Sequence, residues 1–202
     1  LFAISAAAVA LLPASAQARS VKETMVTIRT ADGLADAFFA HPAKGRYPGV
    51  LLWPDFMGLR PAYQQLASKL AQSGYSVLAV NPYYRHARSP IIEVADFENK
   101  EAMQKFRTYS SAITLDTLST DAKAFVGFLD RQQQVDHKSR VGTMGYCMSG
   151  AWTFHVAAAL PEQVGAIASF HGGGLAADDA DSPLHVMGKM RAEALIAIAE
   201  DD

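Results

Sequence analysis

The stretch Gly145-Tyr146-Cys147-Met148-Ser149-Gly150-Ala151 decides how the rest of the chain is interpreted. An apolar run typical of a strand precedes it, at residues 140–146, and an apolar run typical of a helix follows, at residues 148–160. Small residues around a central thiol, between a strand and a helix, indicate a nucleophile elbow, which is a sharp and strained turn that larger side chains would crowd. The N-terminus of the following helix favours a thiolate over a thiol. We therefore interpret Cys147 as a nucleophile.

Two other interpretations of this turn are weaker. Cysteine is among the residue types that are most often buried, so an ordinary core cysteine is the alternative for Cys147. A serine nucleophile at Ser149 would leave Cys147 and Ala151 at the flanking positions, where glycine is expected. The spacing within its strand-helix context favours Cys147.

Working outward from this turn, the apolar pattern predicts a single α/β domain. Asp32-Gly33 indicates a tight hairpin between the first two strands, and Gly74 is placed to end a helix. Strands are expected at residues 24–30, 34–40, 49–53, 75–80, 140–146, 164–170 and 195–199. Helices are expected at residues 61–73, within 97–106, at 115–129 and at 148–160. An antiparallel N-terminal hairpin followed by strand-helix alternation predicts a mostly parallel sheet, whose ligands meet the loops after the strands.

Composition excludes several classes of protein. The chain has 202 residues, half of them hydrophobic, which is ample for the core of one domain. Its 18 basic residues do not exceed its 20 acidic ones, which argues against nucleic-acid binding. One cysteine excludes an internal disulfide framework. The sequence has no glycine-rich nucleotide motif and no metal-ligand spacing, so we expect no cofactor and no metal.

On the cysteine elbow, the order of elements and two loops after strands, the chain resembles the dienelactone hydrolase family of α/β-hydrolases. The family elbow is Gly-x-Cys-x-Gly-Gly, and this chain carries Ser149 in place of the first of the two final glycines. The resemblance runs from about Val21 to the last residue, covering essentially all of the chain after residue 20. It implies hydrolysis of a small lactone or carboxylic ester through an acyl-enzyme on Cys147, with a carboxylate-bearing enol lactone as the family substrate.

The resemblance also implies roles for residues in the two loops. Asp55 stands where the family has a glutamate that helps to form the thiolate, but a carboxylate that caps its own turn is an equal alternative. The backbone N–H groups of Phe56 and Met148 would form the oxyanion hole. Arg85 matches an arginine that binds the substrate carboxylate, although an arginine in a polar loop is often only solvated.

The acid of the triad is expected at Asp201, with Asp202 as the second choice, since both follow the predicted strand at residues 195–199. No histidine follows Asp201, so we expect the catalytic base beyond Asp202 and expect this fragment to be inactive. His171 begins a His-Gly-Gly-Gly segment that follows the nucleophile instead of preceding it. That order argues against a lipase oxyanion loop and favours a structural turn beside the pocket.

The first 18 residues are expected to be a signal peptide without its charged start. They carry no charge, and Ala16-Gln17-Ala18 is a small-x-small cleavage pattern. Residues 19–202 would then be an incomplete α/β-hydrolase domain, exported to the periplasm or secreted, and free of the membrane after cleavage. Because export fits poorly with a catabolic lactonase, a broader esterase or thioesterase is an alternative. A peptidase and a non-catalytic small-molecule-binding domain are further alternatives. The sequence does not indicate an oligomeric state.

Overall fold

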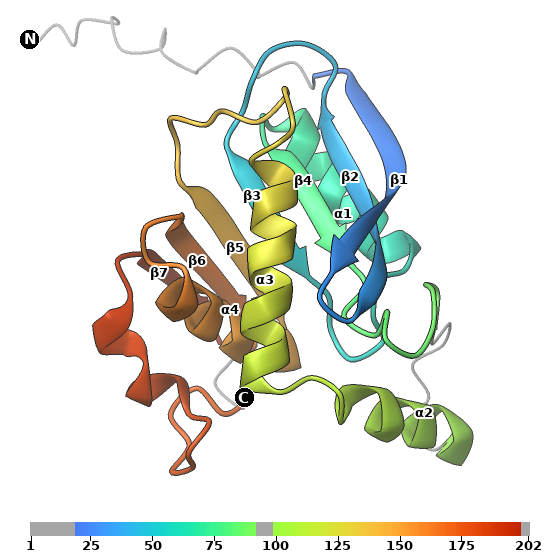
Figure 1. The fold of residues 1–202 in the computed structure, drawn as a ribbon, viewed down its shortest axis with the longest axis vertical. Coiled ribbons are helices and arrows are strands. Elements are labelled where there is room, and N and C mark those ends of the chain that lie inside the picture. Colours follow the sequence, from blue (N-terminus) through green and yellow to red (C-terminus); the bar gives the residue numbers. More distant parts are fainter. Residues whose placement is uncertain (1–18, 92–98, 199–202) are drawn as a thin grey trace, which may run out of the picture.

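The computed structural model describes residues 19–91 and 99–198, and its seven strands form one sheet (Figure 1). The strands lie in the order β1-β2-β4-β3-β5-β6-β7. Their bounds are Val21–Thr30 for β1, Gly33–Pro42 for β2, Gly49–Trp53 for β3, Ser76–Val80 for β4, Val141–Tyr146 for β5, Val164–Phe170 for β6 and Glu193–Ala197 for β7. Strands β4, β3, β5, β6 and β7 pair in parallel, whereas β1 and β2 run antiparallel. The predicted fold class, a mostly parallel sheet with an antiparallel N-terminal hairpin, is confirmed.

The hairpin turns tightly at residues 31–32, with Thr30 paired to Gly33. Gly33 has a φ of +142°, a backbone angle that favours glycine. The two turn residues are therefore 31 and 32, one position earlier than in a turn formed by Asp32 and Gly33. Asp32 lies at the tip of the hairpin, and its side chain is half-exposed.

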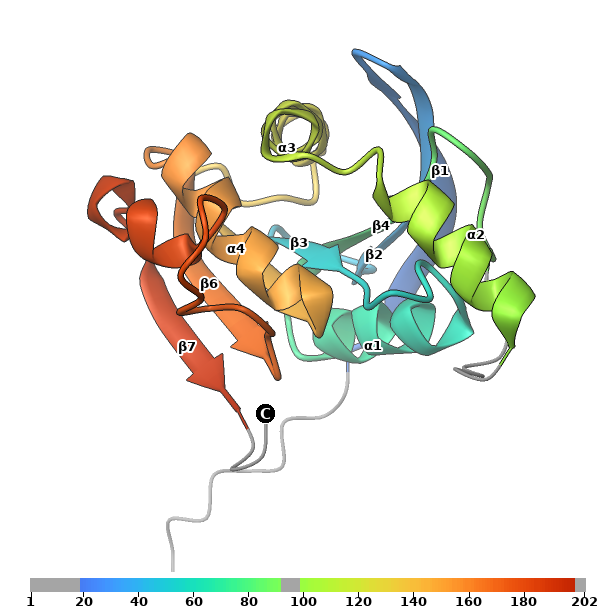
Figure 2. The same ribbon diagram turned by 90° about the horizontal axis from the view of Figure 1, so that it is seen from below.

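Helices cover both faces of the sheet (Figure 2). Their bounds are Pro61–Gln72 for α1, Lys100–Ser110 for α2, Leu115–Leu129 for α3 and Met148–Ala159 for α4, with short 3₁₀ turns at Pro183–His185 and Met187–Lys189. Helices α3 and α4 pack on one face and α1 on the other. Gly74, with a φ of +101°, follows the last turn of α1 as expected.

Helix α2 lies further along the chain than the pattern predicted. Asn99 accepts hydrogen bonds from the N–H groups of Glu101 and Ala102, so its side chain sets the helix start. The helix has no fully buried residue and lies beyond the carboxyl ends of the strands (Figure 1).

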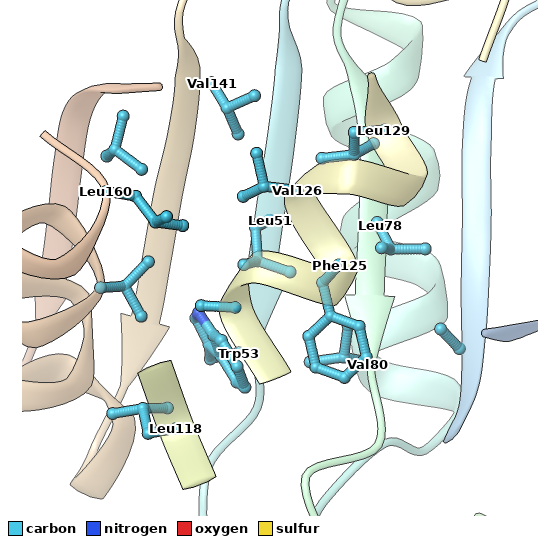
Figure 3. Packing of buried hydrophobic residues seen from close by; sticks show 14 of the residues in the cluster. Leu51, Trp53, Leu78, Val80, Leu118, Phe125, Val126, Leu129, Val141 and Leu160 are labelled. Carbon is cyan, nitrogen blue, oxygen red and sulfur yellow. The ribbon is translucent and has the colours of Figure 1, made fainter. Parts of the chain in front are cut away.

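The larger core lies between the sheet and helices α3 and α4 (Figure 3). Phe125 of α3 is completely buried and meets the ring of Trp53 edge-on, with centroids 5.7 Å apart. The Trp53 indole N–H donates to the hydroxyl of Thr143 on β5, 3.1 Å away. Because Trp53 is the last residue of β3, this packing fixes the point at which the following loop leaves the sheet.

One strand differs from its expected bounds. Strand β7 spans Glu193–Ala197 and so begins two residues before the expected run at residues 195–199; its residues are exposed, with Leu195 at 59%. Within the described residues, β7 pairs in parallel with β6.

Two sequence predictions fall beyond the described ranges. The leader at residues 1–18 and the acids Asp201 and Asp202 lie outside them, so both stay predictions. In the described part of the chain, no helix has the length and apolar character to cross a membrane.

Replacing Phe125 by Ala should destabilise the fold by about 3–5 kcal/mol, because it leaves a cavity against Trp53 that rigid strands cannot fill. Urea unfolding would measure this change. The control is Phe125→Leu, which keeps more of the side-chain volume and should cost clearly less. Equal losses in the two variants would contradict the packing described here.

Candidate active site

Cys147 lies at the point where β5 ends and α4 begins. Its backbone angles are φ 57° and ψ −124°, a region that residues with a side chain seldom occupy. Two backbone hydrogen bonds hold this conformation: the Cys147 N–H donates to the Phe170 carbonyl (3.1 Å), and the Gly150 N–H donates to the Cys147 carbonyl (3.0 Å). The side chain is only half-buried. These are the features of the elbow that the sequence predicted.

The two glycines of the elbow are required by space. A Cβ on Gly145 would stand 2.1 Å from the carbonyl oxygen of Ser149, and one on Gly150 would stand 2.7 Å from the Cα of Gly172. Both contacts are with backbone atoms, which cannot swing away as a flexible side chain can. The strained turn at Cys147 therefore depends on close approach between α4 and the ends of β5 and β6.

Ser149 is buried completely, and its hydroxyl is occupied inside the fold. The oxygen accepts the Tyr146 N–H at 2.8 Å. The hydroxyl proton faces two carbonyl acceptors, that of Trp53 at 3.1 Å and that of Tyr146 at 3.0 Å. This geometry agrees with the assignment of Cys147, not Ser149, as the candidate nucleophile.

The loop after β3 carries Phe56, one of the two predicted oxyanion-hole residues. Tyr83, from the loop after β4, donates its hydroxyl to the Phe56 carbonyl at 2.7 Å and lies 3.8 Å from the sulfur of Met148, the other predicted residue. Tyr83 is almost fully buried. Burial first, then the charges of Asp55 and Cys147, raise the pKa of Tyr83, so that its hydroxyl stays a donor at neutral pH. The structure thus brings Phe56, Tyr83 and Met148 together beside Cys147.

Sequence reasoning missed the role of Tyr83. The only available signal was its position three residues after the end of a buried strand and two residues before Arg85. Its hydroxyl joins two loops whose residues are 27 positions apart, a contact that no local pattern encodes.

Asp55 is bound by its own loop. Both carboxylate oxygens accept hydrogen bonds from the guanidinium of Arg60, at 2.6 and 2.8 Å, and Oδ1 also accepts the Met57 N–H at 3.0 Å. The Asp55 carbonyl accepts the Gly58 N–H, which closes the turn. Of the two roles left open by the sequence, this geometry favours the carboxylate that caps its turn. Activation of the thiol by Asp55 stays a prediction.

Arg85 is likewise bound by protein carboxylates. Its guanidinium donates to Asp121 on α3 and to Asp32 at the hairpin tip, with distances between 2.6 and 2.9 Å. It also lies over the ring of Tyr84, whose hydroxyl donates to Asp121. Desolvation raises the pKa of the buried Asp121, against the effect of these donors. A substrate carboxylate would therefore have to displace Asp32, the exposed partner, for Arg85 to serve as the predicted anchor.

His171 follows β6 directly and has a φ of 39°. Its N–H donates to the Ala197 carbonyl of β7 at 2.7 Å, while its side chain is exposed. It follows Phe170, whose carbonyl holds the Cys147 N–H. This agrees with a structural turn at the end of the strand. Within residues 19–91 and 99–198, no three His, Cys, Asp or Glu side chains are grouped so as to hold a metal ion.

Comparisons with known proteins agree with this geometry. The model of the dienelactone hydrolase family matches residues 35–202. The chain is 29% identical over 156 residues to a carboxymethylenebutenolidase homologue from Synechocystis sp., covering 77% of this chain and 61% of the relative. It is 30% identical over 125 residues to a carboxymethylenebutenolidase from Pseudomonas sp. strain P51, covering 60% of this chain and 50% of the relative. The chain thus spans about half to three-fifths of these relatives.

A solved dienelactone hydrolase homologue from Klebsiella pneumoniae has the same fold, with a TM-score of 0.74 at 20% identity. The alignment covers 91% of this chain and 77% of that one. At this identity the likeness concerns the fold alone.

Replacing Gly150 by Ala should destabilise the chain by about 2 kcal/mol or more and slow alkylation of Cys147, because the new Cβ collides with Gly172 backbone. The matched control is Gly127→Ala in α3, where the nearest atom is the end of the flexible Arg131 side chain, 3.4 Å away. Alanine there should stabilise by up to about 1 kcal/mol through helix propensity. Thermal unfolding and iodoacetamide labelling measure both variants; similar behaviour of the two would refute the steric argument.

Asp55→Asn and Arg60→Met should each destabilise the chain by about 1–3 kcal/mol, since each leaves a partly buried charged group without its partner. Because the carboxylate caps its own turn, neither substitution should change the pH dependence of Cys147 alkylation. The rate of alkylation between pH 5 and pH 9 is the measurement. A pH profile displaced by Asp55→Asn but not by Arg60→Met would instead assign the carboxylate to the thiol.

Proposed function

The chain belongs to the dienelactone hydrolase family, and we propose that it is a hydrolase that cleaves a small lactone or carboxylic ester through an acyl-enzyme on Cys147. The observation that carries the proposal is the backbone at Cys147, with its φ of 57° between β5 and α4. Backbone strain is retained where the surrounding structure enforces it, and here Gly145 and Gly150 make the turn possible.

In the proposed reaction, the Cys147 thiolate attacks the ester carbonyl carbon and forms a carbon–sulfur bond. The N–H groups of Phe56 and Met148 stabilise the negative charge that develops on the carbonyl oxygen. The tetrahedral intermediate then collapses, breaking the carbon–oxygen bond to the alcohol, which takes up a proton as it leaves. Water attacks the resulting thioester, releases the carboxylic acid and restores the thiol. Asp201 is the proposed acid that orients the base for this second step.

The second candidate is an esterase or thioesterase of broader specificity that acts on uncharged substrates. The arrangement of Arg85 favours it over a lactonase specific for carboxylates, because Asp32 and Asp121 already occupy its guanidinium. An enol lactone that bears a carboxylate would compete with Asp32 for Arg85, whereas a neutral ester would not. The two candidates share the same nucleophile and oxyanion hole and differ only in whether Arg85 binds a carboxylate of the substrate.

Mixing the chain with p-nitrophenyl acetate should release a first p-nitrophenolate from each chain in a rapid phase and add one acetyl group to Cys147; any hydrolysis of the thioester would follow as a slower, continuing release. Intact-mass spectrometry and peptide mapping measure the adduct, and p-nitrophenolate absorbance gives its rate. Cys147→Ala should abolish both signals. Acylation that survives this substitution would exclude Cys147 as the nucleophile. Rapid alkylation of Cys147 without any acylation would support the non-catalytic binding domain instead.

A further inference from the structure

We propose that Ser149 is a positioning residue for the hydrolysis proposed above, on which this inference rests. Its hydroxyl joins the nucleophile elbow to the end of β3. It thereby sets the spacing between Cys147 and the loop after β3 that carries Phe56, which we call the oxyanion loop. The sequence places a serine here where the family elbow has glycine. The structure gives that departure a definite set of contacts.

The direct pairing of β3 with β5 ends at Trp53 and Gly145. One residue further on, the Ser149 hydroxyl stands between the two chains. It accepts the Tyr146 N–H at 2.8 Å. Its single proton faces two carbonyl acceptors, that of Trp53 at 3.1 Å across a sequence separation of 96 residues and that of Tyr146 at 3.0 Å. The hydroxyl therefore continues the connection between β3 and β5 past the last paired residues.

Both ends of this bridge lead directly into the active site. Tyr146 is the residue before Cys147, and Trp53 comes three residues before Phe56. The carbonyl of Phe56 is held separately by Tyr83, so the oxyanion loop is fixed at two points. Since stabilisation of an oxyanion requires donors at about 2.7–3.1 Å from the developing charge, a small change in this spacing affects carbonyl chemistry strongly.

The bridge is possible because Gly145 has no side chain. The Ser149 carbonyl comes so close that a Cβ at Gly145 would be 2.1 Å away, and this approach brings the first turn of α4 onto the end of β5. Ser149 itself is excluded from solvent. Loss of its hydroxyl would thus remove a hydrogen-bond partner from the part-buried Tyr146 N–H and from a carbonyl group, and buried polar groups are costly to leave unpaired.

Two substitutions separate this role from a general effect on stability. Ser149→Ala removes the hydroxyl and leaves a methyl group that excludes water. Ser149→Gly removes the whole side chain and leaves room for about one water molecule, which can bridge the same two groups. Helix propensity alone would make Ser149→Ala the less disturbed of the two variants, whereas the bridge predicts that Ser149→Gly acylates faster than Ser149→Ala. Ser76→Ala is the matched control: this fully buried serine donates to the Gln134 carbonyl at 2.8 Å, and that contact joins β4 to the chain before β5.

The experiment compares acylation by p-nitrophenyl acetate with alkylation by iodoacetamide in these variants. Acylation needs the oxyanion hole, whereas alkylation at a saturated carbon needs only the thiolate. We expect Ser149→Ala to acylate at least about 10-fold more slowly, which corresponds to about 1.4 kcal/mol, with alkylation altered less than about 3-fold. Ser149→Gly should acylate within about 3-fold of the unaltered chain, and Ser76→Ala should change neither rate.

The proposal would be overturned if the acylation rate of Ser149→Ala equalled that of Ser76→Ala, or exceeded that of Ser149→Gly. Hydrogen exchange at the Tyr146 amide tests the bridge without any ester. The amide should be protected in the unaltered chain and in Ser149→Gly, and should exchange rapidly in Ser149→Ala; protection in all three would also overturn it. If the unaltered chain does not acylate at all, the proposed function fails, and the exchange result still decides whether the bridge exists.

Discussion

The backbone conformation of Cys147 is the constraint on which the arrangement of the site depends. A φ of 57° is unfavourable for a residue with a side chain, and such strain costs on the order of 1–3 kcal/mol. It is maintained because the first turn of α4 approaches the end of β5 closely, which glycines at positions 145 and 150 allow. The packing of Trp53 against Phe125 fixes the neighbouring strand, so that the oxyanion loop starts from a rigid point.

Local features of the fold could be predicted from the sequence. The run at Gly49–Trp53 is apolar on every side, as expected for a strand buried on both faces, and β3 has those bounds. The elbow was predictable because its glycines, its thiol and its flanking apolar runs lie within about twenty residues of each other. The start of β7 was less predictable, because the strand begins at Glu193, two residues before the apolar run at residues 195–199.

The partners of the charged residues could not be predicted in the same way. Arg85 reaches Asp32 and Asp121, which are 53 and 36 residues away in the chain. Asp55 and Arg60 are close in sequence, yet nothing in the pattern says whether the carboxylate faces its own turn or the thiol. Ser149 contacts Trp53 across 96 residues. Each of these contacts depends on how the loops and helices pack at the carboxyl ends of the strands.

The proposed reaction requires Cys147 and the amides of Phe56 and Met148 to act on one carbonyl group. A crystal structure of the chain acetylated on Cys147 is the most direct test of this claim. The acetyl oxygen should lie about 3 Å from both amide nitrogens, with the backbone of the elbow unchanged. An acetyl group on another residue, or an acetyl oxygen directed away from both amides, would contradict it.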